Sequence, residues 1–243
     1  MFEPSLIQAL EKLAQVVHGV ADPDLDRAWA WGAYDSEGVR FAFFRSLEEL
    51  RELAVRVAAL RARRGPAITA AQRILAQYHA AHRDLEAALL GLDPELEDRA
   101  PAEGEWSIRR TVAHIAGADV GFYVVVRYAL DQHQQGVAEP VPVPDEAWET
   151  LLGQDIASLE AILDGSLAGI QSYREVLHQR ILREFAGIGA EDLDLPSNYW
   201  EGYPLSIRFR LHRFESHLRQ HTVQVDKALH GLGCPPNEAT RLL

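Results

Sequence analysis

The chain has 243 residues, 47% of them hydrophobic and 25% charged, which is typical of a globular protein with one large domain or two modules. Its formal net charge of −12 argues against non-specific binding to nucleic acid, because phosphate contacts need a surface rich in Lys and Arg. A single cysteine, Cys234, excludes an intramolecular disulfide and a multi-cysteine zinc site, so histidines and carboxylates must hold any metal.

The amino-terminal segment "MFEPSLIQALEKL" has no basic region followed by an apolar region, so no secretory signal is expected. The most apolar run, "VGFYVVVRYAL", is shorter than the roughly 20 residues that cross a bilayer and contains Arg127. We therefore expect a cytoplasmic protein without membrane partners.

Residues 1–66 are predicted to form a small module with the element order α-β-β-α. Apolar residues recur at intervals of three and four over residues 3–20, which is typical of an amphipathic helix. Alternating apolar residues on both sides of a turn signal at residues 35–38 predict a β-hairpin over residues 29–43. Four aromatic residues of this hairpin are expected to cover the bundle or a dimer contact rather than to bind substrate: Trp29, Trp31, Phe41 and Phe43.

A second helix is expected to close this module. Ser46 followed by Glu49 has the sequence of a capping box, so the helix should begin there and end at Gly65. No strand pattern returns after this point, and residues 67–243 are assigned to a second domain.

The second domain is predicted to be a four-helix bundle, which makes the fold class mainly α. Thr69 with Gln72 forms a capping box at the start of the first helix, and Ser107 is placed to cap the second. Each expected helix carries an apolar stripe on one side. The four helices are expected at residues 69–92, 107–135, 145–186 with a break near Gly165, and 205–230.

The last expected helix contains three histidines within a stretch of ten residues, His212 to His221. At 100° per residue, His221 and His217 lie about 40° and about 80° from the centre of its apolar stripe, on the same side. His212 points about 140° away and should face solvent. Two histidines one turn apart can hold one divalent ion, but the same spacing is common in packed or surface pairs. A metal site also needs a third ligand, for which His114 is the best-placed candidate.

Two segments resemble DinB-like proteins. "EWSIRRTVAHIAGAD" resembles the family's Trp-Ser segment that leads to a histidine, and "ESHLRQHTVQV" resembles its last helix, with His-x-x-x-His followed by Gln three residues later. The family includes bacillithiol and mycothiol S-transferases and mycothiol-dependent maleylpyruvate isomerase. The resemblance covers about residues 67–232 and implies a DinB-like four-helix bundle, to which the α-β-β-α module is an N-terminal extension.

The resemblance implies that His114, His217 and His221 are metal ligands and that Gln224 is their neighbour. Zinc or nickel is the expected metal, and iron, manganese or copper also suits imidazole ligands. The implied activity is that of a metal-dependent thiol S-transferase or a thiol-dependent isomerase, with a low-molecular-weight thiol and a small electrophile as partners and a homodimer as the assembly. The alternatives are a metal-dependent small hydrolase and a non-enzymatic, stress-associated metal-binding scaffold. No catalytic residue is assigned.

The chain departs from the family pattern beside these ligands. Relatives often have a histidine directly before the last ligand, where this chain has Gln220. Many have an acidic residue before the first histidine of the pair, where this chain has Ser216. These changes leave the ligands in place but alter their surroundings, on which the exact chemistry depends.

Other polar and aromatic residues are weaker candidates. Asp119 falls on the apolar face of the second bundle helix, so it should bond a ligand histidine or, as we favour, pair with a cation of another helix. Cys234 has no histidine or cation beside it in the sequence and is not expected to be a nucleophile.

Three aromatic residues of the loop at 194–204 are expected to form a pocket wall or to close the core: Tyr199, Trp200 and Tyr203. Four helical histidines have no partner at ligand spacing and receive no role: His79, His82, His133 and His178.

Overall fold

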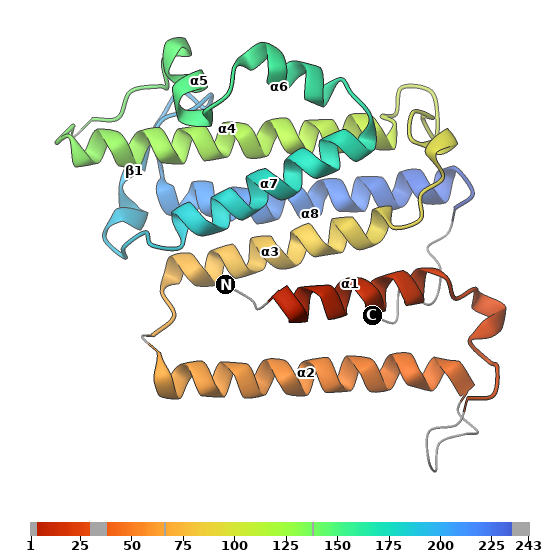
Figure 1. Cartoon of the computed structure of the whole chain (residues 1–243). Coiled ribbons are helices and arrows are strands. Elements are labelled where there is room, and N and C mark those ends of the chain that lie inside the picture. Colours follow the sequence, from red (N-terminus) through yellow and green to blue (C-terminus); the bar gives the residue numbers. More distant parts are fainter. Residues whose placement is uncertain (1–3, 30–37, 66, 138, 235–243) are drawn as a thin grey trace. The chain divides into compact units, whose positions relative to one another are not determined.

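The computed structural model is mainly α-helical, as the sequence predicts (Figure 1). No helix among the described residues is long and apolar enough to cross a bilayer. The chain forms two compact units, one of Met1–Ala67 with Cys234–Leu243 and the other of Ile68–Gly233. The structure describes residues 4–29, 38–65, 67–137 and 139–234.

The first unit contains helix α1 (Pro4–His18), a short 3-10 helix η1 (Asp22–Asp24) and a long helix α2 (Gly38–Arg64). Its small apolar core contains Val17 and Phe43, which are 1% and 7% exposed. The first predicted helix is therefore confirmed, whereas the second begins eight residues before the expected Ser46.

The predicted β-hairpin is wrong at its second strand, because residues 39–43 belong to α2. Gly38, the last residue of the predicted hairpin turn, has a φ of +69° and begins the helix instead. Val39 and Phe43 are four residues apart, so a helix places both on the face that packs on the core. Alternation over so few residues cannot exclude this helical spacing. The first predicted strand, at residues 29–33, lies outside the described residues except for Trp29.

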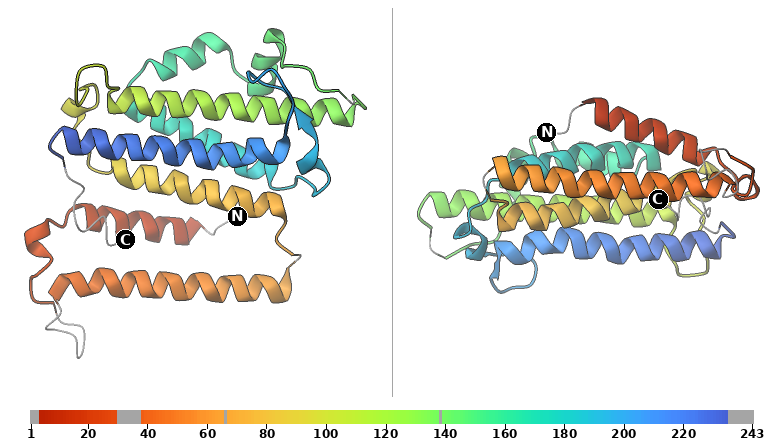
Figure 2. Two further views of the ribbon diagram at one scale, coloured as in Figure 1. Left: turned by 180° about the vertical axis from the view of Figure 1, so that it is seen from behind. Right: turned by 90° about the horizontal axis from the view of Figure 1, so that it is seen from below.

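The second unit is a bundle of four long helices, which confirms the predicted fold: α3 (Ala70–Leu89), α4 (Ile108–Gln134), α7 (Leu167–Phe185) and α8 (Ile207–Gly231). Helix α8 packs beside α3 and α4, and α7 packs on the other side of the same two helices (Figure 2). Large rings fill the centre of the bundle, among them Tyr78, Tyr123, Phe185 and Phe214, each fully buried.

Side-chain caps fix the starts of these helices. Thr69 accepts a hydrogen bond from the N–H of Gln72 (3.1 Å), and the Gln72 side chain accepts one from the N–H of Thr69 (3.2 Å), which completes the predicted capping box. Ser107 caps α4 by accepting a hydrogen bond from the N–H of Arg110 (3.2 Å). These contacts fix the residues at which α3 and α4 begin.

The expected third helix is divided into three. Helix α5 (Asp145–Leu152) ends at Gly153, whose φ is +71°, and Asp155 caps the next helix, α6 (Ile156–Leu163). The predicted break near Gly165 is confirmed, and the break at Gly153 was not predicted. The remaining short elements are η3 (Pro94–Leu96), η4 (Asp192–Asp194) and two antiparallel strands, β1 (Pro196–Ser197) and β2 (Leu205–Ser206).

Candidate metal centre

Two neighbouring helices, α4 and α8, carry the three predicted ligands. The ring of Trp106, just before α4, lies 6.4 Å from the ring of His221, late in α8. The ring of Phe122, farther along α4, lies 5.6 Å from that of Phe214, which comes earlier in α8. The two helices therefore run in opposite directions, and His114 of α4 faces the histidine pair of α8.

The three histidines converge at one point of this helix pair. The Nε2 atoms of His114 and His217 are 3.2 Å apart. The ring centroid of His221 is 4.6 Å from that of His114 and 4.4 Å from that of His217. One possible ligand atom of each residue lies within 4.8 Å of those of the other two. His212, in contrast, is exposed, as the helical geometry of the sequence predicts.

This set of donors fits a divalent transition metal. Burial, followed by the charges of nearby His221 and His114, lowers the pKa of His217 to about 3. Burial also lowers the pKa of His114. Both rings are therefore neutral at pH 7 and have a lone pair to donate. Two nitrogens bound about 2.0–2.1 Å from one tetrahedral ion are about 3.3–3.4 Å apart, close to the 3.2 Å between Nε2 of His114 and Nε2 of His217.

Gln224 fixes the orientation of the third imidazole. Its Oε1 atom accepts a hydrogen bond from Nδ1 of His221 at 2.8 Å. Because Nδ1 then carries the proton of the neutral ring, Nε2 has the lone pair that a metal would use. The spacing of three residues along α8 makes this contact possible.

A cavity of about 730 Å³ opens beside His114 and His217. Such a volume suits a small organic ligand. The Trp106 ring meets the His114 ring edge on, with 5.1 Å between centroids. Tyr203 is 58% exposed and does not line the cavity, unlike the other two loop aromatics expected there. Aromatic side chains supply much of the wall: Trp106, Phe122, Tyr199 and Trp200.

A buried arginine holds the loop that carries Tyr199 and Trp200. Arg210 of α8 is fully buried and donates hydrogen bonds to both carboxylate oxygens of Glu201, one of them at 2.8 Å. It donates a further hydrogen bond to Oγ of Ser197 at 3.1 Å. A bidentate arginine–carboxylate pair of this kind constrains direction as well as distance, so the cavity wall is anchored to the same helix as two of the candidate ligands.

Gly121 of α4 leaves the space that Tyr199 occupies. A Cβ atom at this position would lie 2.1 Å from the Tyr199 hydroxyl oxygen and 3.0 Å from its Cζ atom. Any larger residue would therefore displace the ring, and with it part of the cavity wall.

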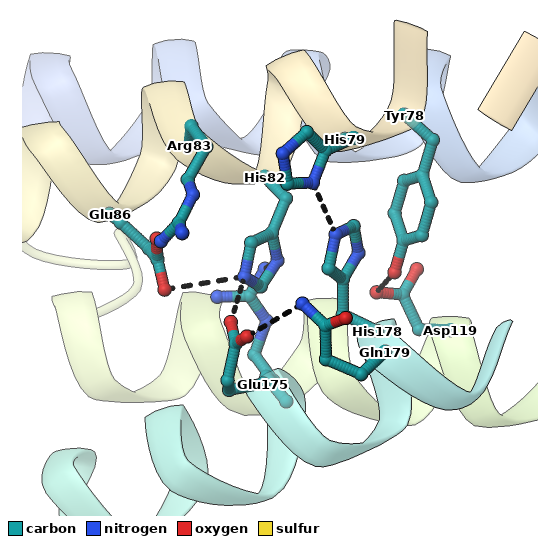
Figure 3. Close-up of polar contacts among 10 residues, drawn as sticks. Tyr78, His79, His82, Arg83, Glu86, Asp119, Glu175, His178 and Gln179 are labelled. Carbon is teal, nitrogen blue, oxygen red and sulfur yellow. Dashed lines mark hydrogen bonds and ion pairs between the residues drawn. The ribbon is translucent and has the colours of Figure 1, made fainter. Parts of the chain in front are cut away.

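A second group of polar side chains lies in the bundle between α3, α4 and α7 (Figure 3). Tyr78 donates a hydrogen bond to Oδ2 of Asp119 at 2.9 Å. Burial raises the pKa of Asp119 to about 6, and burial together with the charge of Asp119 raises the pKa of Tyr78. Arg174 lies close enough for its charge to oppose the shift of Asp119. No hydrogen bond among the described residues joins Asp119 to the three candidate ligands.

His82 connects two glutamates in this group. Its Nε2 atom is 2.9 Å from Glu175 and 3.3 Å from Glu86, and these three side chains could also hold an ion. The Nδ1 atom of His82, however, lies 3.4 Å from the Arg174 guanidinium, which is a hydrogen-bond donor. A metal at Nε2 would leave the proton of the neutral ring on Nδ1, so two donors would then face each other. A hydrogen bond from Nε2–H of a neutral His82 to Glu175 fits better, because Nδ1 can then accept from Arg174, and this bond lowers the pKa of Glu175 to about 2.

Two further histidines complete the group. His79 Nδ1 and His178 Nε2 are 2.9 Å apart, and the His178 ring stacks on the His82 ring with 3.9 Å between centroids. His133, farther along α4, has its Nε2 atom 2.9 Å from the carbonyl oxygen of Pro196. The sequence predicts no role for these histidines, because spacing along one helix cannot reveal partners that lie on other elements.

Spacing within one helix could have found two cavity residues that the sequence predictions leave out. Arg110 and Arg213 line the cavity, and each comes four residues before a candidate ligand, His114 and His217 respectively. Trp106 stands in the segment that carries the family resemblance, but its contact with His221 depends on how α4 packs against α8.

Several solved structures are similar to the chain. They include YfiT from Bacillus subtilis, described as a probable metal-dependent hydrolase with an unusual four-helix bundle topology (17% identity, TM-score 0.48, 69% of this chain and 91% of that chain covered). A protein from Streptococcus pneumoniae has 11% identity and a TM-score of 0.46, over 69% of this chain and 94% of that chain. The DfsB sibling lethal factor precursor has 16% identity and a TM-score of 0.45, over 66% and 95%.

A comparison with family models shows which family the bundle belongs to. The model described as the DinB superfamily matches residues 77–225, a segment that begins within α3, ends within α8 and contains all three histidines. No curated protein matches the chain. Because the matched segment is more than half of the sequence, the chain belongs to the DinB superfamily.

Proposed function

We propose that this protein binds one divalent transition metal through His114, His217 and His221 and carries out metal-dependent thiol chemistry. The reaction is S-transfer from a low-molecular-weight thiol to a small electrophile, or a thiol-dependent isomerisation. The observation that carries the proposal is the convergence of three imidazoles, two of which, His114 and His217, line a cavity of about 730 Å³. Zinc and nickel suit these ligands best, with iron, manganese and copper as further candidates.

The chain's own residues prepare this site for a thiol. A divalent ion with three neutral ligands and an open position supplies positive charge that lowers the pKa of a thiol. Trp106 lies against His114 and parallel to His221, so it keeps water away from one side of the imidazoles. Gln224 holds His221 with its Nε2 lone pair available.

The polar groups around the cavity favour a thiol over water as the nucleophile. Asp164 is the one carboxylate among the described residues that line the cavity, and it is exposed. A hydrolase gains from a well-placed base that removes a proton from water. A thiol, whose ordinary pKa is about 8.5, needs less assistance. A metal-dependent hydrolase remains the alternative and uses the same three histidines.

The test of the metal site is elemental analysis of protein expressed with zinc, nickel, iron, manganese and copper supplements. We expect about one equivalent of metal in the wild type. His217→Ala should lose most of it, whereas His212→Ala, on the exposed side of the same helix, should keep it. Metal-poor wild-type protein, or equal metal content in the two variants, would rule out the proposed ligands.

The test of the activity uses the metal-loaded protein, a panel of thiols and an electrophilic dye. We expect conjugation of the dye with at least one thiol and its loss in His217→Ala. Hydrolysis of a panel of esters and amides without any conjugation would instead support the metal-dependent hydrolase. Metal-loaded protein that is inactive in both assays would favour a non-enzymatic metal-binding role.

A further inference from the structure

Two arginines, Arg110 and Arg213, line the cavity beside the histidines. None of the ion pairs formed by the described residues involves either of them. Glu201, on the loop that forms the cavity wall, has both carboxylate oxygens bonded to Arg210. Among the residues that the structure describes, the cavity lining contains these two arginines and one carboxylate, Asp164, so it carries an excess of positive charge in a chain with a net charge of −12.

Each of the two guanidinium groups lies over an aromatic ring. The guanidinium carbon of Arg110 is 4.7 Å from the ring centroid of Trp106, and that of Arg213 is 5.6 Å from the ring centroid of Phe122. A guanidinium attracted to a ring in this way still has N–H groups with which to bind a carboxylate or phosphate. Both supporting rings belong to the cavity wall.

The two arginines lie on opposite sides of the histidines. Arg110 precedes His114 by one turn of α4, and Arg213 precedes His217 by one turn of α8. Because α4 and α8 are antiparallel, one turn, about 6 Å along the axis, leads in opposite directions from the site. The cavity therefore has a positive group on each side of the point where the imidazoles converge.

We propose that the cavity binds organic anions, and that Arg213 and Arg110 each hold a carboxylate or phosphate group of the molecules that reach the histidines. The inference rests on the proposed function, because it names the class of ligand for that same site. Arg213 is half-buried and Arg110 is exposed, so Arg213 makes the larger contribution. The aromatic wall accommodates the apolar part of the ligand.

The test is calorimetric titration of the full-length protein with benzoate, phenyl phosphate and the neutral analogue benzamide. It is carried out on protein as purified and again after removal of metal with a chelator, so that binding of an anion to the metal is separated from binding to arginine. Arg213→Gln, Arg110→Gln and Arg213→Lys are compared with the wild type. Arg109→Gln is the matched control, because Arg109 is the neighbour of Arg110 in sequence but pairs with Asp98 and does not line the cavity.

We expect at least one of the two anions to bind metal-free protein at least about tenfold more tightly than benzamide. Arg213→Gln should remove about tenfold of this affinity and Arg110→Gln a smaller factor, whereas Arg213→Lys should retain part of it and Arg109→Gln all of it. Preference for benzoate identifies the group as a carboxylate, and preference for phenyl phosphate identifies a phosphate.

Equal binding of benzamide and both anions, no binding of either anion, or equal losses in Arg213→Gln and Arg109→Gln would overturn the inference. The outcome is independent of the thiol assay. Anion binding without conjugation removes the proposed function and leaves the anion site, whereas conjugation without anion preference removes the anion site alone.

Discussion

The Oε1 atom of Gln224 accepts a hydrogen bond from Nδ1 of His221 at 2.8 Å, one turn along the same helix. In the neutral form of the ring, this contact favours the tautomer with the proton on Nδ1, and the lone pair of Nε2 lies on the other side of the ring. Outer partners of this kind orient metal-binding histidines and affect affinity although they do not touch the metal. We therefore expect Gln224 to act as a positioning residue of the proposed metal centre.

We predict that Gln224→Leu lowers the affinity for zinc by about 10- to 100-fold without unfolding the protein. Gln224→Glu keeps an oxygen acceptor for Nδ1 of His221 and should bind zinc nearly as well as the wild type. Competition with a chromophoric chelator measures both constants. Gln220→Leu, at an exposed position of the same helix, is the control, and a loss there equal to that in Gln224→Leu would contradict the assigned role.

Metal binding is also expected to stabilise the folded chain. A ligand that binds only the folded state at 100 times its Kd adds about 2.7 kcal/mol to the free energy of unfolding. We predict that zinc raises the midpoint of thermal unfolding of the wild type by several degrees and leaves His114→Ala nearly unchanged. His114 is exposed, so its replacement leaves the core intact, and the metal-free midpoints should agree. An equal zinc effect on both proteins would show that the ion binds elsewhere.

The bundle could be predicted from sequence because its signals are local. The Thr69 and Gln72 capping box and the Ser107 cap each depend on residues three positions apart, and the structure has both. The hairpin prediction is wrong because its local signal is ambiguous. The spacing of Val39 and Phe43 suits a strand or a helix, and contact with the core at Val17, which is distant in sequence, decides between them.

The candidate site could be predicted only where its geometry lies within one helix. His217 and His221 are four residues apart on α8, whereas His114 lies on α4 and was assigned through the family resemblance. The pairing of His82 with Glu175 joins α3 to α7, and no spacing along one helix reveals it. The packing of helices against one another determines such contacts.

The close approach of Tyr199, a residue of the cavity wall, to Gly121 predicts the effect of an alanine at this position. Replacing a glycine inside a helix by alanine normally stabilises the helix by about 0.5–1 kcal/mol. At Gly121 the added Cβ would meet the Tyr199 hydroxyl at 2.1 Å, so we predict that Gly121→Ala lowers the free energy of unfolding by about 1–3 kcal/mol. Chemical denaturation measures this change, and Tyr199→Ala in the same chain should relieve it.

Gly117 is the matched control for this substitution. It lies one turn earlier on α4, and its added Cβ would be 3.8 Å from the nearest side-chain atom, on Leu163. Gly117→Ala should therefore be neutral or stabilising. If Gly117→Ala and Gly121→Ala change stability equally, the close approach of Tyr199 is not the cause.

The buried histidine of the second polar group makes stability depend on pH. His178 is fully buried and stacks on the His82 ring. Burial, followed by the charges of His82 and His79, lowers the pKa of His178 to about 2. In the unfolded chain the same imidazole has its ordinary pKa of about 6.5, so it takes up a proton at a pH about 4.5 units higher than in the folded chain. Between these two values the unfolded state binds more protons, so stability falls as the pH falls.

We predict that the free energy of unfolding of wild-type protein decreases more steeply between pH 6.5 and pH 5 than that of His178→Gln, by up to about 1.4 kcal/mol per pH unit. Urea denaturation of chelator-treated proteins at pH 8, 6.5, 5.75 and 5 measures the two slopes. His178→Gln should be less stable at pH 8, where it lacks the ring stacking, and should approach the wild type as the pH falls. Glu175 and His82 titrate in both proteins, so the difference between the slopes reports His178. Parallel slopes would mean that His178 takes up its proton in the folded protein as readily as in the unfolded chain, which its burial opposes.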